Sequence, residues 1–149
     1  MKMILKSVVT IIYFSCVCYI VFFARRRELM QYAPPSQLVN LVPVVHQIEA
    51  YKGLNPTDPR EAQHFVTNLL GNVALFVPFS ILLLAFGYRS TKGILLTAFL
   101  VSLSIEVIQY SFAIGVADVD DVLLNVGGAY AGILLFHFIP VTVRSAVFR

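Results

Sequence analysis

Four long apolar stretches, with a single acidic residue among them, are the feature that most constrains this chain. They cover about residues 7–24, 65–87, 93–116 and 122–143, and Glu106 is the acidic residue. A helix that crosses a bilayer needs roughly 20 mainly apolar residues. The sequence therefore predicts an all-α membrane protein, an antiparallel bundle of four transmembrane helices in a single domain over residues 1–149.

The composition supports this class. Of the 149 residues, 58% are hydrophobic and 13% are charged, whereas soluble domains have about 45–50% apolar and about 25% charged residues. This balance excludes a disordered chain, a basic nucleic-acid-binding domain and a disulfide scaffold. Lys2 and Lys6 precede the first stretch as in a signal peptide, but its end lacks a small-residue cleavage site, which favours a retained span.

The first long loop, residues 25–64, contains an amphipathic piece at residues 38–51. Its apolar residues recur at helical spacing although Pro43 lies among them; they are Leu38, Leu41, Val42, Val45 and Ile48. The piece predicts a short interfacial or re-entrant helix. A loop that packs against the bundle without such a helix remains an open alternative.

The basic residues near the span ends favour cytoplasmic termini by a narrow margin. Six lie on the side of the termini, namely Lys2, Lys6, Arg89, Lys92, Arg144 and Arg149, and five on the other, namely Arg25, Arg26, Arg27, Lys52 and Arg60. The loop before the fourth span is purely acidic. We therefore predict that both termini lie in the cytoplasm of a bacterial cell.

Several polar residues occur at membrane depth, where each needs a partner or a polar cavity. Ser102, Glu106 and Gln109 share one helix face by their spacing, and Asn68 and Asn72 share another. Asp118, Asp121 and Asn125 share a third face if their helix begins by Ala117. Span order places all of these in the same half of the bilayer. We expect one polar, mainly acidic pocket on the extracytoplasmic side, formed by Asn68, Asn72, Glu106, Gln109, Asp118, Asp120, Asp121 and Asn125.

Structural roles compete with functional ones at these positions. The two asparagines could bond helix to helix, and the acidic turn could be a solvated cap of the fourth helix. Small residues allow neighbouring helices to approach closely, which is the role expected of Gly71, Gly127, Gly128 and Gly132. Glu106 is the residue least explained by packing.

The sequence contains no established catalytic motif. Glu106 with Asp118 or Asp121 is a candidate acid and base pair. Asp118 and Asp121 could contribute oxygen ligands to a divalent cation, although no cofactor is expected. Zinc, phosphate-loop and nucleotide patterns are absent from the sequence.

Three segments resemble the VanZ-like family of small bacterial membrane proteins. They are residues 68–79, residues 106–109 and residues 118–128, and residues 40–43 resemble the family's loop motif. Two arginines common in the family are replaced, one by Gln37 and one just before the acidic turn, where Val116 and Ala117 stand. The resemblance implies low-level resistance to teicoplanin, a lipid-tailed glycopeptide.

The expected partners are membrane lipid and, as candidates, the lipoglycopeptide or a cell-wall precursor, but no nucleic acid. The protein would bind the drug, or would reorganise envelope lipids or precursors, at the outer face of the cytoplasmic membrane. An intramembrane enzyme that modifies an envelope lipid or precursor remains an alternative, as does a structural protein of envelope assembly. Four spans without a repeat are few for a transporter unless the chain forms an oligomer.

Overall fold

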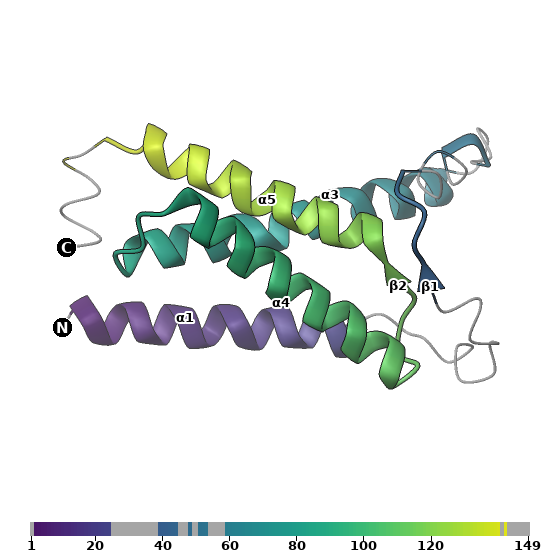
Figure 1. The fold of residues 1–149 in the computed structure, drawn as a ribbon, viewed down its shortest axis with the longest axis horizontal. Coiled ribbons are helices and arrows are strands. Elements are labelled where there is room, and N and C mark those ends of the chain that lie inside the picture. The colour runs from purple at the N-terminus through teal and green to yellow at the C-terminus, as the bar shows by residue number, and fades with distance from the viewer. Residues whose placement is uncertain are drawn as a thin grey trace.

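The structure is a computed structural model that describes residues 2–24, 39–44, 48, 51–53, 59–140 and 142. Helix α1 (Lys2–Tyr19) continues into the π-helical turn η1 (Ile20–Ala24), and β1 (Val39–Asn40) follows (Figure 1). The remaining elements are α3 (Pro59–Ala85), α4 (Thr91–Ser111), β2 (Ala117–Asp118) and α5 (Val119–Phe138). Long helices therefore dominate the described part of the chain.

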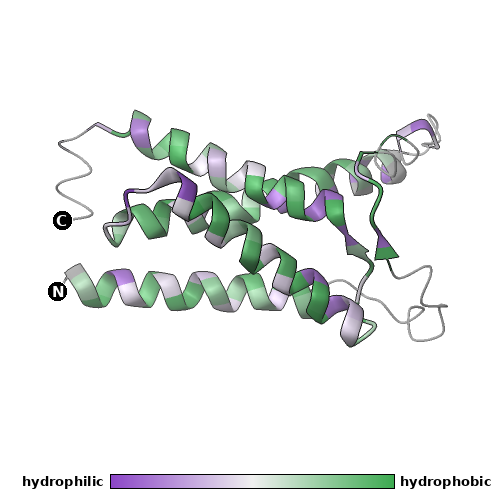
Figure 2. Ribbon diagram, viewed as in Figure 1, coloured by the Kyte–Doolittle hydropathy of each residue, from purple (hydrophilic) through white to green (hydrophobic). Residues whose placement is uncertain are grey.

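Four of these helices are long and apolar enough to cross a membrane, which confirms the predicted fold class. The segments are Met3–Phe22, Phe65–Ala85, Thr91–Ser111 and Val119–Phe138. In Figure 2, hydrophilic segments interrupt the apolar helices at the end of the bundle that carries β1 and β2. The protein is thus a multi-pass membrane protein whose intramembrane polar residues gather toward one end.

The helix ends differ from the predicted spans by a few residues. The third span was expected to reach residue 116, but α4 ends at Ser111, and Ala113 has a left-handed φ of 49° in the turn that follows. The fourth was expected from residue 122, but α5 begins at Val119 because Asp118 caps it. It ends at Phe138, two residues before Pro140, which lacks the N–H that a continuing helix needs.

Hydrogen bonds show how the helices run relative to one another. Lys6 Nζ donates to the carbonyl of Ala85 (3.0 Å), and the Tyr13 hydroxyl donates to the carbonyl of Leu75 (2.6 Å). Residue numbers rise along α1 as they fall along α3, so these two helices are antiparallel. Figure 1 shows that the start of α1, the turn between α3 and α4, and the end of α5 lie at the same end of the bundle.

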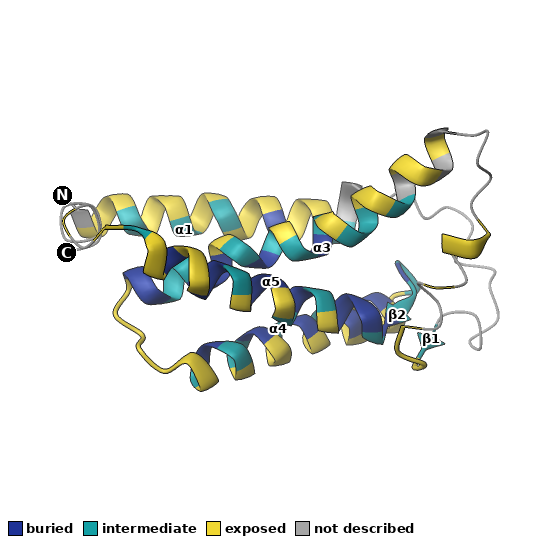
Figure 3. Ribbon diagram, turned by 90° about the horizontal axis from the view of Figure 1, so that it is seen from above, coloured by how far each residue is buried: buried dark blue, intermediate teal, exposed yellow. Residues whose placement is uncertain are grey.

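The core of the bundle lies where α3, α4 and α5 meet. One buried cluster contains Phe76, Phe79, Ala98 and Ala129, and a second contains Leu84, Ile94, Ile133 and Phe136. Helix α1 is peripheral, since Val17 is its one buried residue among those described. Figure 3 shows this contrast between the mostly exposed α1 and α5, in which nine of 20 residues are buried. The exposed apolar side chains of α1 are those that lipid would cover.

Two of the four glycines expected to mediate close packing do so. A Cβ at Gly128 would overlap the backbone carbonyl of Val73, and one at Gly132 would overlap Ser80 Oγ and the carbonyl of Val77. Helix α5 therefore lies directly against α3. At Gly71 and Gly127, no described atom beyond the local helix backbone and the chain neighbours lies within 4 Å of such a Cβ. Within the described part of the chain, these two glycines therefore mediate no close helix contact.

The first long loop begins differently from the predicted helix. Val39 and Asn40 are extended and pair in parallel with Ala117 and Asp118. Val44 has a left-handed φ of 66°, and among the described residues up to Gly53, helical backbone occurs at Ile48 and at residues 51–52. Residues 39–44 therefore do not form the first part of the predicted helix, because Val39 and Asn40 pair with β2 and Pro43 lacks the N–H that a helix interior needs. Leu38 and Val45 lie outside the described residues.

Candidate functional site

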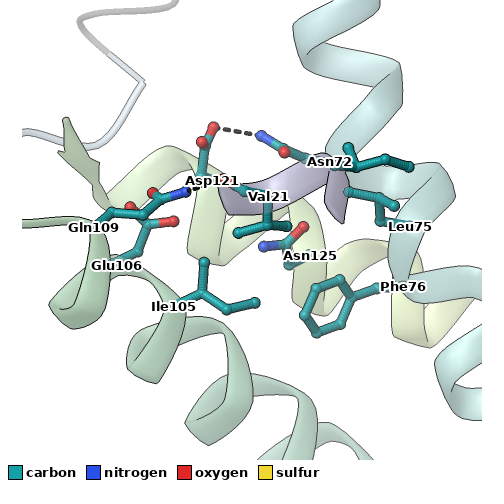
Figure 4. A pocket seen from close by; sticks show the side chains of 10 residues that line it. Val21, Asn72, Leu75, Phe76, Ile105, Glu106, Gln109, Asp121 and Asn125 are labelled. Atoms are coloured by element: carbon teal, nitrogen blue, oxygen red, sulfur yellow. Dashed lines mark hydrogen bonds between the residues drawn. The ribbon is translucent and has the colours of Figure 1, made fainter. Parts of the chain in front are cut away.

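A polar cavity lies between η1, α3, α4 and α5, near the end that carries β1 and β2. Its lining joins five polar side chains to an apolar wall, as Figure 4 shows, and consists of Ile20, Val21, Asn72, Leu75, Phe76, Ile105, Glu106, Gln109, Asp121 and Asn125. With its open mouth the hollow encloses about 360 Å³, but water-sized molecules can centre in about 20 Å³ of it. That is room for about one or two water molecules.

Helix α4 supplies three polar residues on its buried face. Ser102, Glu106 and Gln109 are 0%, 5% and 4% exposed, whereas Ser104 between them is exposed. This is the face that the three- and four-residue spacing predicts. The carboxylate Oε2 of Glu106 accepts a hydrogen bond from the backbone N–H of Asp118 (2.9 Å). This hydrogen bond of Glu106 therefore links α4 to the start of α5.

Asp118 caps α5. Its Oδ1 accepts from the backbone N–H of Asp120 (2.8 Å), which a helix start leaves without an intrahelical partner. The same oxygen accepts from Asn40 Nδ2 (3.0 Å). The face that would join Asp118 to Asp121 and Asn125 required a helix that begins by Ala117, and α5 begins at Val119. Asp118 thus precedes that face, and the cap is buried, not solvated.

Asp120, two residues after Asp118, also forms a hydrogen bond with the first loop. Its Oδ1 accepts from the backbone N–H of Val44 (2.7 Å). Its Oδ2 is buried and has no hydrogen-bond partner among the described residues. Asp118 and Asp120 are not among the residues that line the cavity. Their contacts instead bind the loop around β1 to the start of α5.

Two amides join α5 to its neighbours. Asn72 Nδ2 donates to Asp121 Oδ1, which links α3 to α5, and both residues are buried (Figure 4). Asn125 Nδ2 donates to Ser102 Oγ (2.8 Å), which links α4 to α5. The helix-to-helix role considered for Asn72 is therefore present, and the residue also lines the cavity.

The cavity wall includes residues that sequence reasoning did not select. Gln109 Nε2 donates to the backbone carbonyl of Val21 (3.3 Å), so a main-chain oxygen of η1 takes part. The apolar wall also comes from Ile20, Leu75 and Ile105. Ile105 is adjacent in sequence to Glu106, and Leu75 lies three residues after Asn72, whereas no such signal marks Ile20. No periodicity reveals that a backbone carbonyl near the end of the first span faces Gln109.

The structure brings together five of the eight predicted pocket residues: Asn72, Glu106, Gln109, Asp121 and Asn125. Asn68 is half-buried and is not among the lining residues. Glu106 and Asp121 share the cavity, so they are the carboxylate pair that a common ligand would meet. No group of three His, Cys, Asp or Glu within the described part of the chain is arranged to hold a metal ion.

The sequence of this chain matches a known protein family. A family model described as VanZ/LLP1 matches residues 10–140. The chain belongs to the VanZ/LLP1 family. Every cavity residue lies inside the matched range, so the VanZ-like resemblance drawn from the motifs is confirmed.

One VanZ relative is Protein VanZ of Enterococcus faecium. It is 36% identical over 87 residues, which are 57% of this chain and 53% of the relative. The chain thus spans about half the length of this curated relative. No solved structure matches the chain.

Proposed function

We propose that this VanZ/LLP1 protein gives bacteria low-level resistance to lipoglycopeptide antibiotics such as teicoplanin. Membership of the family and a relative named Protein VanZ support this role. The observation that carries it is the network of carboxylates and amides inside one end of the bundle, within the segments that resemble the family. Ionisable groups within membrane spans are costly to bury, and where they occur they commonly mark functional sites.

The proposed orientation places both termini in the cytoplasm and the cavity toward the outer leaflet of the cytoplasmic membrane. The start of α1, the α3–α4 turn and the end of α5 share one end of the bundle, and the cavity lies toward the other. Basic residues slightly favour the first end as cytoplasmic. A lipid-tailed drug anchors in the outer leaflet, so the cavity and the drug would meet at the same depth.

The size of the cavity favours one form of this role over another. Sites for drug-sized ligands usually enclose about 300–1,000 Å³, whereas this cavity has room for about one or two water molecules. A whole glycopeptide does not fit inside. We therefore favour a mechanism in which the protein engages lipid or precursor groups around the drug, and the drug itself stays outside the bundle.

The test is expression in a teicoplanin-susceptible Gram-positive host at matched membrane levels. Inhibitory concentrations of teicoplanin and vancomycin are compared for wild type, Glu106→Gln, Asp121→Asn and the control Ser104→Ala, whose side chain is exposed on α4. The expected result is a rise for teicoplanin alone, lost in both carboxylate variants and kept in the control. A correctly inserted wild type that gives no rise would refute the proposal.

An intramembrane enzyme is the second candidate, because Glu106 and Asp121 line one cavity. It would modify an envelope lipid or precursor with the pair as acid and base. Mass spectrometry of the membrane lipids would then show a product that disappears completely with either Glu106→Gln or Asp121→Asn. An unchanged lipid profile beside intact teicoplanin protection would favour binding over catalysis.

A further inference from the structure

We infer that the cavity binds the hydroxyl group of a primary alcohol, R–CH₂–OH, carried by a lipid headgroup or by a small soluble alcohol. The inference rests on the proposed function to the extent that both use this cavity. It adds the chemical class of the ligand, which the family match and the relative's name do not contain.

The first observation is an unused acceptor. Asn125 is 5% exposed and lines the cavity, and its Nδ2 donates to Ser102 Oγ. Its Oδ1 is buried and has no hydrogen-bond partner among the described residues. A carbonyl oxygen that loses water without gaining another donor is destabilising. The site therefore favours a ligand that donates a hydrogen bond to Asn125.

The second observation is that uncharged amide donors lie beside this acceptor. An amide NH₂ group has two N–H donors, and those of Asn72 and Gln109 each make one described hydrogen bond. Figure 4 shows the side chains of Asn72, Gln109 and Asn125 converging from α3, α4 and α5 on one space. Glu106 and Asp121 already accept hydrogen bonds from protein N–H groups. The hydrogen-bonding capacity offered to a ligand is thus that of the neutral amides.

This mixture of donors and an acceptor selects among ligand groups. A hydroxyl both donates and accepts, whereas an ammonium group has donors alone and an ionised carboxylate has acceptors alone. A hydroxyl can donate to Asn125 Oδ1 and accept from an amide N–H in the same position. It therefore matches the lining better than either charged group.

The third observation is size and surroundings. The space for about one or two water molecules accommodates a hydroxyl oxygen and little more. Leu75, Phe76 and Ile105 supply apolar surface beside the amides. That surface suits the methylene carbon of a primary alcohol, and the rest of the ligand would remain at the open mouth.

The test uses the full chain in phosphatidylcholine nanodiscs, whose headgroups have no hydroxyl. A small, equal fraction of phosphatidylglycerol or phosphatidylmethanol is added, and native mass spectrometry measures the retained lipid. These two lipids carry the same charge, but phosphatidylmethanol has no headgroup hydroxyl. We expect about tenfold stronger retention of phosphatidylglycerol, because its hydroxyl gives a buried acceptor its donor. Equal retention, together with no effect of ethylene glycol, would overturn the inference.

Variants locate the effect at the cavity. Asn125→Leu should abolish the preference for phosphatidylglycerol, while Ser104→Ala should keep it. Asn125→Asp should also keep it, because a carboxylate can accept from the ligand and from the Ser102 hydroxyl. If Asn125→Leu does not fold, Ile105→Phe replaces it, since the larger ring would fill the space. A preference that survives Ile105→Phe, or that Asn125→Asp loses, would refute the site.

Ethylene glycol tests a soluble source of the hydroxyl in nanodiscs of phosphatidylcholine alone. Thermal unfolding is compared with an equal concentration of its dimethyl ether, which has no hydroxyl. Where the two lipids are retained equally, a larger stabilisation by ethylene glycol that Asn125→Leu or Ile105→Phe removes supports the site and assigns it to a soluble alcohol. If neither the lipids nor the glycol differ from their controls, water alone fills the site and the inference is wrong. The drug assay is independent, so a hydroxyl site without teicoplanin protection would refute the proposed function alone.

Discussion

Substitution of two adjacent glycines tests how closely α3 and α5 pack. In Gly128→Ala, the new Cβ would overlap backbone atoms of Val73, including its carbonyl oxygen. Backbone atoms cannot rotate away, so the helices must separate. Overpacking of this kind costs about 1–3 kcal/mol. In Gly127→Ala the new Cβ enters open space.

The difference between Gly128→Ala and Gly127→Ala isolates the steric overlap with Val73, because both changes raise helix propensity equally. Alanine is better than glycine in a helix by about 1 kcal/mol, and this gain cancels in the difference between the variants. Gly128→Ala should therefore be less stable than Gly127→Ala by about 1–3 kcal/mol. At about 2–4 °C per kcal/mol for a chain of this size, the melting temperatures should differ by several degrees.

The assay is thermal unfolding of both purified variants in the same detergent, followed by circular dichroism. Gly127→Ala should melt at or above the wild-type temperature, and Gly128→Ala below it. Equal melting temperatures for the two variants would show that α5 does not approach α3 at Gly128. The opposite order would place Gly127 at the contact and rotate α5 by about 100° from its described position.

Three further changes test individual contacts. Ser102→Ala leaves the Asn125 amide without its acceptor and should lower the free energy of unfolding by about 1–3 kcal/mol, whereas the exposed Ser104→Ala should stay within about 0.5 kcal/mol of wild type in the same denaturation assay. Tyr13→Phe removes the α1–α3 hydrogen bond and should cost about 0.5–1.5 kcal/mol, measured by thermal unfolding. Asn40→Ala should speed amide hydrogen exchange in residues 39–44 but not in α5, which mass spectrometry would measure. Exchange that changes equally in both segments would refute the attachment of the loop by Asn40.

The sequence predicts the parts of this fold that depend on local periodicity. Apolar length was enough to identify the four spans, even with Glu106 in the third, because lipid requires that length whatever the helices contact. The spacing of Ser102, Glu106 and Gln109 was enough to place them on one face, since helix geometry fixes it. This face supplies two of the five polar residues that line the cavity, Glu106 and Gln109.

Features that depend on a partner element were not predictable in the same way. Gly127 and Gly128 have equal helix-packing potential in the sequence, and only the position of α3 shows that Gly128 is the contact. Val39 and Asn40 pair with residues 78 positions later. That pairing overrides the helical spacing of their neighbours. Asp118 likewise does not share a helix face with Asp121 and Asn125. It is the N-cap of α5, where its side chain accepts from the backbone N–H of Asp120.

The contacts divide the carboxylates into two roles, and this division decides which substitutions are informative. Asp118 and Asp120 accept from Asn40 and from the backbone of Val44, so they attach the first loop to α5. Asp121 lines the cavity and accepts from Asn72 Nδ2 of α3. Loss of function at Asp118 would therefore follow from a displaced loop alone.

Glu106 belongs to both groups, since it lines the cavity and accepts from the Asp118 N–H. An amide oxygen at this position can still accept that hydrogen bond, so Glu106→Gln removes the charge while it retains the attachment of α4 to α5. Glu106→Leu removes both. If Gln and Leu variants lose function equally while only Leu loses stability, the charge in the cavity is what function requires.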